Sequence, residues 1–156
     1  MKQAKVLTDK ELKKVTDYID AFDRHSDRNK TIVLLTHYCG MRISEVGSLL
    51  KSDVVNAQGE VNDVIHLTAQ QTKGSKSRRV FVNKKAKTAI KRYLQSNLSV
   101  LQHPYLFQTQ KSKRFNTNAL TQLVKRLYDR VGIVGASSHS GRRTFITKLA
   151  TSGVSV

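Results

Sequence analysis

The chain has 156 residues, 38 % of them hydrophobic, and we expect neither an integral membrane protein nor a signal peptide, because it holds no apolar run suited to either. Its formal net charge of +17 falls entirely on residues 64–156, since residues 1–63 carry equal numbers of acidic and basic side chains. This asymmetry predicts a surface that faces a polyanion, with nucleic acid as the leading partner; an anionic membrane fits less well, because no large apolar stripe lies opposite the basic residues.

The first third of the chain is predicted to be helical. Residues 8–11 (TDKE) form a capping box that opens a helix with apolar side chains at helical spacing. After a polar break at residues 24–29, the nearly continuous apolar run at 30–38 predicts a helix central to the core. Gly40 is expected to end it in a left-handed conformation, and a short third helix begins around residues 42–44.

Cysteine and histidine usage predicts an intracellular protein without a metal site. The single cysteine, Cys39, cannot form an internal disulfide, and its apolar surroundings predict a buried free thiol in a reducing compartment. His37, His66 and His103 have no spacing that suggests metal ligands.

The periodicity changes in the middle of the chain. Short strands are predicted at residues 53–55, 64–68, 71–73 and 79–82, with turns at 56–60 and 74–76. Asn83 and Asn116 then stand where side chains cap helices, and Ser137 or Ser138 is expected to cap the last one. In that last helix three apolar residues are expected to face the core: Phe145, Ile146 and Leu149. The order predicts a single domain over residues 1–156, mainly α with a small three-stranded antiparallel β-sheet (α+β).

Basic side chains gather in three clusters: residues 39–46, 72–79 and 138–145. In the last cluster His139 and Arg142 are three residues apart on one helix face, with Arg143 beside them. An imidazole next to a guanidinium can hold a phosphate and move a proton near it. Taken alone, the pair is also typical of a solvated helix face, and Arg42 in the first cluster could simply pair with Glu45.

Taken together, the clusters resemble the motifs of the tyrosine recombinase (phage integrase) family. Residues 40–46 (GMRISEV) are similar to its first arginine motif, and residues 139–142 (HSGR) resemble its H-x-x-R motif. Lys73 stands where the family carries a hairpin lysine, with Lys76 as the alternative on the same hairpin. Residues 7–11 are similar to the start of its catalytic domain, and the matches run in family order along essentially the whole chain.

The resemblance implies site-specific DNA recombination. Members of the family cleave a strand by attack of a tyrosine hydroxyl on the scissile phosphate, which leaves a 3′-phosphotyrosyl bond and a free 5′-hydroxyl. Arg42 and Arg142 would stabilise the transition state, Lys73 would protonate the leaving oxygen, and His139 would assist proton transfer or hydrogen-bond the phosphate. Because the energy of the bond is retained, no cofactor and no metal ion is implied.

The chain departs from the family pattern at two points. Arg143 stands where the family usually has histidine. None of the tyrosines lies where the nucleophile belongs, beyond Arg142, and we expect the family's N-terminal core-binding domain to be absent as well. We therefore expect a truncated catalytic domain that binds DNA and positions the scissile phosphate but is inactive alone.

Partners and location follow from the same resemblance. Six further basic residues are expected to bind double-stranded DNA: Lys76, Arg78, Lys111, Lys113, Arg114 and Arg143. No membrane contact is expected; the fragment is expected to be a monomer in solution and the full-length protein a tetramer on DNA. A bacterial or phage-encoded protein of a mobile genetic element, cytoplasmic and nucleoid-associated, fits this description.

Two other function classes stay open. One is a non-catalytic DNA-binding regulator derived from a recombinase, which would share the basic surface but not the cleavage activity. The other is a basic RNA-binding protein, suggested only by charge. Against it, the chain shows no aromatic-bearing strand of the kind that stacks single-stranded bases.

Overall fold

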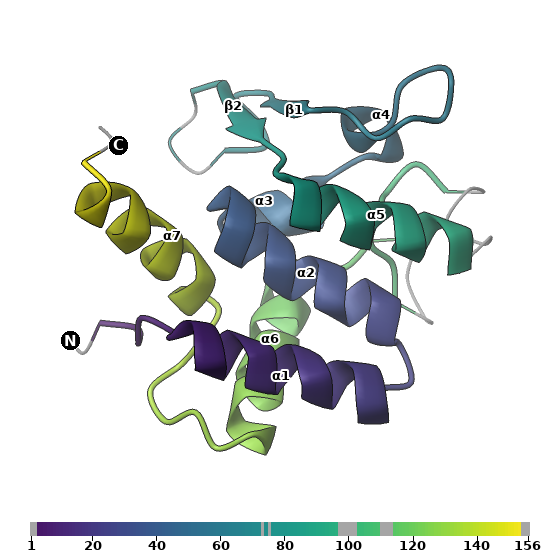
Figure 1. Cartoon of the computed structure of the whole chain (residues 1–156). Helices are drawn as coiled ribbons and strands as arrows, with labels where there is room; N and C mark the ends of the chain where they lie inside the picture. Colours follow the sequence, from purple (N-terminus) through teal and green to yellow (C-terminus); the bar gives the residue numbers. More distant parts are fainter. Residues whose placement is uncertain (1–2, 73, 75, 97–102, 110–113, 154–156) are drawn as a thin grey trace.

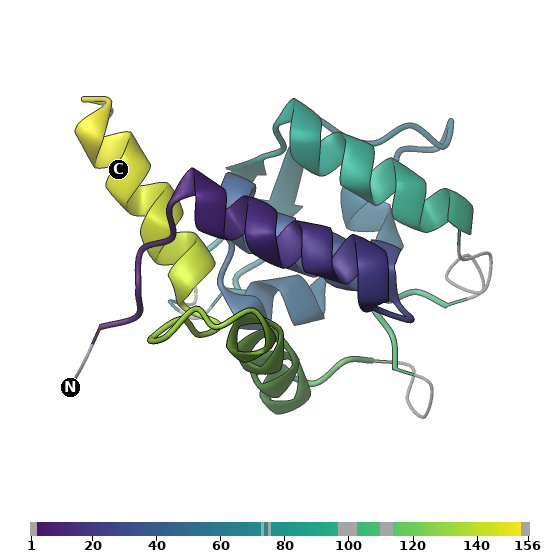
Figure 2. The same cartoon turned by 60° about the horizontal axis from the view of Figure 1, so that its bottom comes forward.

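The computed structural model describes residues 3–72, 74, 76–96, 103–109 and 114–153. In chain order its elements are α1 (Asp9–Phe22), α2 (Ser26–Cys39), α3 (Ile43–Ser48), α4 (Lys51–Val54), β1 (Val64–Leu67), β2 (Arg78–Phe81), α5 (Lys84–Ser96), α6 (Thr117–Arg130) and α7 (Ser140–Thr151). Figure 1 shows α2 in the middle, with α1 and α5 along it and α7 at one end. In Figure 2, α6 comes forward below α1. The prediction of a mainly α fold with a small antiparallel sheet is confirmed.

The sheet has two strands in the described part of the chain, β1 and β2, so the prediction of a third is wrong. Residues 53–55, predicted as a strand, fall instead in and directly after α4. The cause is local, because the Asp53 carboxylate accepts the Leu50 N–H at 2.9 Å and closes a helical turn. One isolated bridge, between Val55 and Val61, is what remains of the pairing expected there.

The strand predicted at residues 71–73 is a turn at residues 71 and 72, and Lys73 lies outside the described residues. Instead of pairing as a strand, this segment is held by hydrogen bonds of the Gln71 side chain. Its oxygen accepts the Thr68 N–H at 2.9 Å, and its amide nitrogen donates to the Ser48 carbonyl at 3.2 Å. This turn therefore lies against the end of α3.

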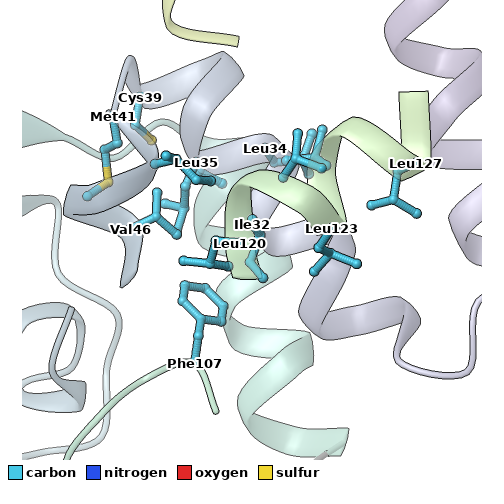
Figure 3. Packing of buried hydrophobic residues seen from close by; sticks show 14 of the residues in the cluster. Ile32, Leu34, Leu35, Cys39, Met41, Val46, Phe107, Leu120, Leu123 and Leu127 are labelled. Carbon is cyan, nitrogen blue, oxygen red and sulfur yellow. The ribbon is translucent and has the colours of Figure 1, made fainter. Parts of the chain in front are cut away.

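The hydrophobic core is centred on α2. Ile32 and Leu35 of this helix are fully buried, and Figure 3 shows them close to Leu120 of α6 and to Phe107. Cys39 is a buried free thiol, as predicted, and burial raises the pKa of this thiol to about 11. Among the described residues, no helix is long and apolar enough to cross a membrane.

Helix ends follow the local sequence signals in most places. The capping box at Thr8 is present, and the side chains of Asn83 and Asn116 accept backbone N–H groups at 2.9 and 2.8 Å, as predicted. α2 ends at Gly40 in a left-handed conformation with φ of 68°, also as predicted. It begins at Ser26 rather than at residue 30, because polar residues suit the first turn, where backbone N–H groups have no partner within the helix.

The last helix differs from its prediction at its start. His139, not Ser137 or Ser138, occupies the N-cap position of α7, without a side-chain cap. The Ser137 hydroxyl instead accepts the His139 N–H at 3.3 Å, while the Ser140 hydroxyl accepts the Ser137 N–H at 2.9 Å. These bonds hold the segment before α7 in a tight turn and place His139 at the N-terminus of the helix.

The prediction that the apolar residues of α7 face the core is confirmed only for Phe145, whose ring packs against Gly40 at the end of α2. Phe145, Ile146 and Leu149 are only partly buried, whereas three small residues are buried: Ser140, Gly141 and Thr144. A Cβ at Gly141 would collide with the side chain and backbone of Thr36 on α2, so the two helices approach closely at this point. Thr144 adds a bond to the N-terminal segment, because its hydroxyl accepts the Leu7 N–H at 2.8 Å.

Candidate functional site

A cleft of about 1240 Å³ opens between α3, the start of α6 and the start of α7. Its lining includes Arg42 from the start of α3, Arg114 from the segment before α6, and His139, Arg142 and Arg143 from the start of α7. The chain thus brings basic groups from segments far apart in the sequence to one concave surface. Three of the four residues assigned to catalysis meet here, and Lys73 lies outside the described residues.

Arg142 is tied to the end of α2. Its Nη1 donates to the carbonyl oxygen of Gly40 at 2.6 Å, a group that the left-handed turn leaves exposed to α7. Partial burial, together with the nearby charges of Arg42 and Arg78, lowers the pKa of the Arg142 guanidinium, and Glu45 works in the opposite direction. Arg142 is therefore held in place next to other cations, and an anion in the cleft would relieve their repulsion.

Arg42 occupies the N-cap position of α3. Its backbone N–H donates to Glu45 Oε1 at 2.9 Å, and its Nη1 lies 3.4 Å from Glu45 Oε2. The local pairing left open by the sequence is therefore present, but it does not remove Arg42 from the cleft, because its side chain stays 38 % exposed. Arg42 faces its carboxylate on one side and the cleft on the other.

Sequence reasoning considered Glu45 only as a partner of Arg42 and missed both its burial and its bonds to Arg78. Its side chain is completely buried, and it receives Arg78 Nη2 at 2.6 Å and Arg78 Nε at 3.1 Å as well as Arg42. Burial opposes ionisation, yet these hydrogen bonds and charges hold the pKa of Glu45 below its usual value, so it is a carboxylate. Its sequence signal was a glutamate three residues after an arginine at a helix start.

His139 is exposed and lines the cleft from the N-cap position of α7. It precedes Arg142 by one helical turn, so both side chains lie on the same wall. An exposed imidazole at this point can donate to or accept from a bound phosphate.

The residues predicted to bind DNA are divided among different places. Arg143 and Arg114 line the cleft, and the guanidinium of Arg114 lies over the ring of Tyr105, 5.4 Å from its centroid. Lys76 is exposed before β2, and Arg78 is directed to Glu45. Lys111 and Lys113 lie outside the described residues.

The five tyrosines, all in the described part of the chain, stand away from the cleft. Tyr93 and Tyr128 are buried, and burial raises the pKa of both hydroxyl groups. Tyr18, Tyr38 and Tyr105 are partly buried on other surfaces. None of the five lies among the residues that line the cleft.

Comparison with known proteins decides the family. The model of the phage integrase family matches residues 5–156. The chain belongs to the phage integrase family. Among curated relatives, Transposase A from transposon Tn554 of Staphylococcus aureus is 32 % identical over 97 % of this chain and 43 % of its own length. Tyrosine recombinase XerA of Pyrococcus horikoshii is 30 % identical over 97 % of this chain and 50 % of its own.

Solved structures of tyrosine recombinases share the fold of this integrase-family chain. The crystal structure of XerA recombinase matches with a TM-score of 0.80 and 26 % identity, over 99 % of this chain and 54 % of that one. XerH recombinase bound to its difH substrate matches with a TM-score of 0.71 at 24 % identity, over 97 % of this chain and 44 % of that one, a likeness that shows the fold alone. The chain spans about half the length of the relatives it matches.

Proposed function

We propose that this chain is the phosphate-holding part of a site-specific tyrosine recombinase that breaks and rejoins double-stranded DNA. The observation that carries the proposal is that Arg42 and Arg142, from distant segments of the chain, line the same cleft together with His139. Two guanidinium groups can contact the oxygens of one phosphate. The curated relatives, a transposase and a tyrosine recombinase, support DNA as the ligand.

In the proposed reaction these groups act on a transition state in which the phosphorus is pentavalent. A tyrosine oxygen forms a bond to phosphorus while the bond to the 5′-oxygen breaks, so the strand ends as a 3′-phosphotyrosyl ester and a 5′-hydroxyl. Arg42 and Arg142 stabilise the charge that develops on the phosphoryl oxygens. Lys73 gives a proton to the leaving oxygen, and His139 assists proton transfer or hydrogen-bonds the phosphate. Rejoining is the reverse reaction.

The nucleophile is proposed to be a tyrosine outside these 156 residues, because the five tyrosines of the chain stand away from the cleft. The test is to express the gene with its following codons and incubate the product with a nicked duplex that traps the covalent intermediate. A protein–DNA adduct that survives denaturation, and that is lost when the added tyrosine becomes phenylalanine, is expected. An extended protein that binds the duplex without an adduct would instead be a non-catalytic DNA-binding regulator.

DNA binding by the 156-residue chain is proposed to be mainly electrostatic, because its net charge is +17. The logarithm of its affinity for duplex DNA should fall linearly with the logarithm of salt concentration, with a slope of about −0.9 for each phosphate contacted. Fluorescence anisotropy with a labelled duplex over a series of salt concentrations measures this slope. Binding that is insensitive to salt would contradict the proposal.

Assembly and location belong to the same proposal. The 156-residue chain is proposed to be monomeric in solution, and the full-length protein to act as a tetramer on DNA in the cytoplasm, associated with the nucleoid. Sedimentation of the chain and of the extended protein, each with and without a duplex target, measures these states.

A further inference from the structure

The buried carboxylate of Glu45 pairs with two arginines, and a third arginine lies near them. Glu45 has no exposed side-chain surface and contacts both Arg42 and Arg78, while Arg142 lies close enough for the charges of Arg42 and Arg78 to lower its pKa. Arg42 and Arg142 line the cleft, whereas Arg78 does not. Any effect of Arg78 on the cleft therefore has to act through Glu45.

Arg78 holds Glu45 more tightly than Arg42 does. Its Nη2 and Nε donate to the two different carboxylate oxygens, at 2.6 and 3.1 Å, which is the bidentate arrangement that a planar guanidinium favours. Arg42 approaches with one nitrogen at 3.4 Å, and its stronger bond to Glu45 comes from its backbone N–H at 2.9 Å. The carboxylate thus fixes the backbone of Arg42 while Arg78 satisfies its charge.

We propose that Arg78 is a positioning residue for Arg42. By satisfying the charge of Glu45, it keeps this carboxylate from drawing the Arg42 guanidinium away from the phosphate. This rests on the proposed function only in taking the ligand of the cleft to be the scissile phosphate. Without Arg78, the buried carboxylate has Arg42 as its remaining charged partner, and a buried anion pairs strongly with whatever cation it can reach.

Two simpler roles for Arg78 predict different behaviour. In the first, Arg78 only fastens β2 to α3, so that its loss would loosen the fold whatever residue stands at position 45. In the second, Arg78 contacts the phosphate itself, so that its loss would weaken binding even when Glu45 is neutral. Under the positioning role, the loss matters only while Glu45 is a carboxylate.

A double-mutant cycle separates these roles. The 156-residue chain and its variants R78Q, E45Q and E45Q/R78Q are titrated with inorganic phosphate, and binding is followed by NMR through the side-chain Nε–H signals of arginine. R42Q identifies the pocket, because its loss should abolish the phosphate-dependent shifts. Gln at position 45 keeps an oxygen that can accept the Arg42 N–H, so this change removes charge and leaves the helix start in place.

The expected results follow from the charge of Glu45. R78Q should weaken phosphate binding about tenfold, which corresponds to about 1.4 kcal/mol. In the E45Q background the same change should alter binding by less than about twofold, so that E45Q/R78Q binds nearly as well as E45Q. Should R78Q fold poorly on its own, the comparison of E45Q with E45Q/R78Q still tests the proposal, because neither variant contains the buried carboxylate that R78Q leaves without Arg78.

Arg79 supplies the matched control. It is the next residue of β2, exposed and on the opposite side of the strand, so R79Q removes the same charge without touching Glu45. R79Q should leave phosphate binding within about twofold of the parent chain. Thermal unfolding of every variant reports any loosening of the fold separately.

The outcomes distinguish this inference from the proposed function. Phosphate binding that R78Q leaves unchanged, or that falls as much in the E45Q background as in the parent chain, overturns the positioning role and leaves the cleft as a phosphate site. A parent chain that shows no phosphate-dependent shifts sensitive to R42Q overturns the phosphate site and the positioning role together.

Discussion

Basic side chains line two hollows of this molecule, and the two are built differently. The cleft at the start of α7 presents Arg142, which donates to a backbone carbonyl, and Arg42, which shares a buried carboxylate with Arg78. A second groove, of about 850 Å³, lies between α1, α2, α5 and α7. Its basic residues are Lys13, Lys30, Lys84, Lys85, Arg92 and Lys148. A lining of cations therefore does not by itself make an anion site.

The groove neutralises its charge locally. Lys148 lies 2.6 Å from Asp9, Lys30 lies 2.9 Å from Asp20, and Arg92 Nε lies 3.2 Å from Asp27. The acids come from the first third of the chain, which is electrically neutral as a sequence, and two of these bases come from the strongly basic remainder. In the folded chain these acidic residues therefore neutralise basic residues of the groove. The excess positive charge lies in the cleft and on other surfaces.

The largest effect is expected from removing an arginine of the cleft. In the extended protein, R142Q should reduce the rate of strand cleavage at least about a hundredfold, because it removes a charged hydrogen-bond donor worth about 3 kcal/mol in the transition state. Single-turnover cleavage of the nicked duplex measures this. R92Q removes an arginine from the groove and should leave the rate of cleavage unchanged. An equal loss of cleavage rate in R142Q and R92Q would show that the cleft and the groove do not differ in function.

A second prediction concerns His37, which is buried beside the groove. Neither ring nitrogen has a hydrogen-bond partner in the described residues, and burial lowers the pKa of His37 to about 4, with Lys148 and Lys85 lowering it and Asp9 raising it. Since the unfolded value is near 6.5, the unfolded chain binds the proton more readily. Stability present above pH 6.5 is therefore lost as the pH falls toward 4, by on the order of 3 kcal/mol.

Chemical denaturation between pH 7 and pH 4 checks this, with H37L as the comparison. Leucine fills a similar volume without a titrating group, so H37L should lose less stability than the parent chain over this range. Both proteins carry the same carboxylates, whose protonation therefore cancels in the difference. Parallel stability curves for the two proteins would show that His37 is not held neutral by its surroundings.

The third prediction concerns α7, which contributes residues to both the cleft and the groove. G141A should destabilise the fold by about 1–3 kcal/mol, because the added methyl group meets Thr36 and pushes α7 away from α2. The same displacement should strain the Arg142–Gly40 bond on the cleft side and the Lys148–Asp9 pair on the groove side. Thermal unfolding measures the loss, and T147A, at an exposed site on the same helix, should stay within about 0.5 kcal/mol of the parent.

The sequence predicted best what depends on neighbours along the chain. The caps at Thr8, Asn83 and Asn116 are side-chain bonds to a backbone group three residues away, so composition at that spacing was enough. The same holds for Arg42 and for the segment from His139 to Arg142, because each motif is continuous in the sequence. Their meeting in one cleft was expected from a family resemblance, not from spacing.

What the sequence did not predict depends on contacts between distant segments. The bond from Arg78 to Glu45 joins a strand to a helix 33 residues earlier, and neither residue carries a local signal for it. The burial of Gly141 and Thr144 in place of larger apolar residues of α7 reflects a close approach to α2 that hydrophobicity does not encode. The missing third strand shows a local cap at Asp53 overriding a strand pattern.

The smallest expected effect concerns the salt dependence of DNA binding. Arg143 lines the cleft beside Arg142, and Arg92 lies in the groove 3.2 Å from Asp27. If the cleft faces the DNA, R143Q should reduce the steepness of the plot of log affinity against log salt by about 0.9, the value for one phosphate contact. R92Q removes the same formal charge and should leave the slope unchanged, because a paired side chain facing away from the DNA releases no counterion. Anisotropy titrations of both variants give the two slopes under the same conditions, and an equal reduction in both would mean that the DNA is bound by overall charge and not by the cleft.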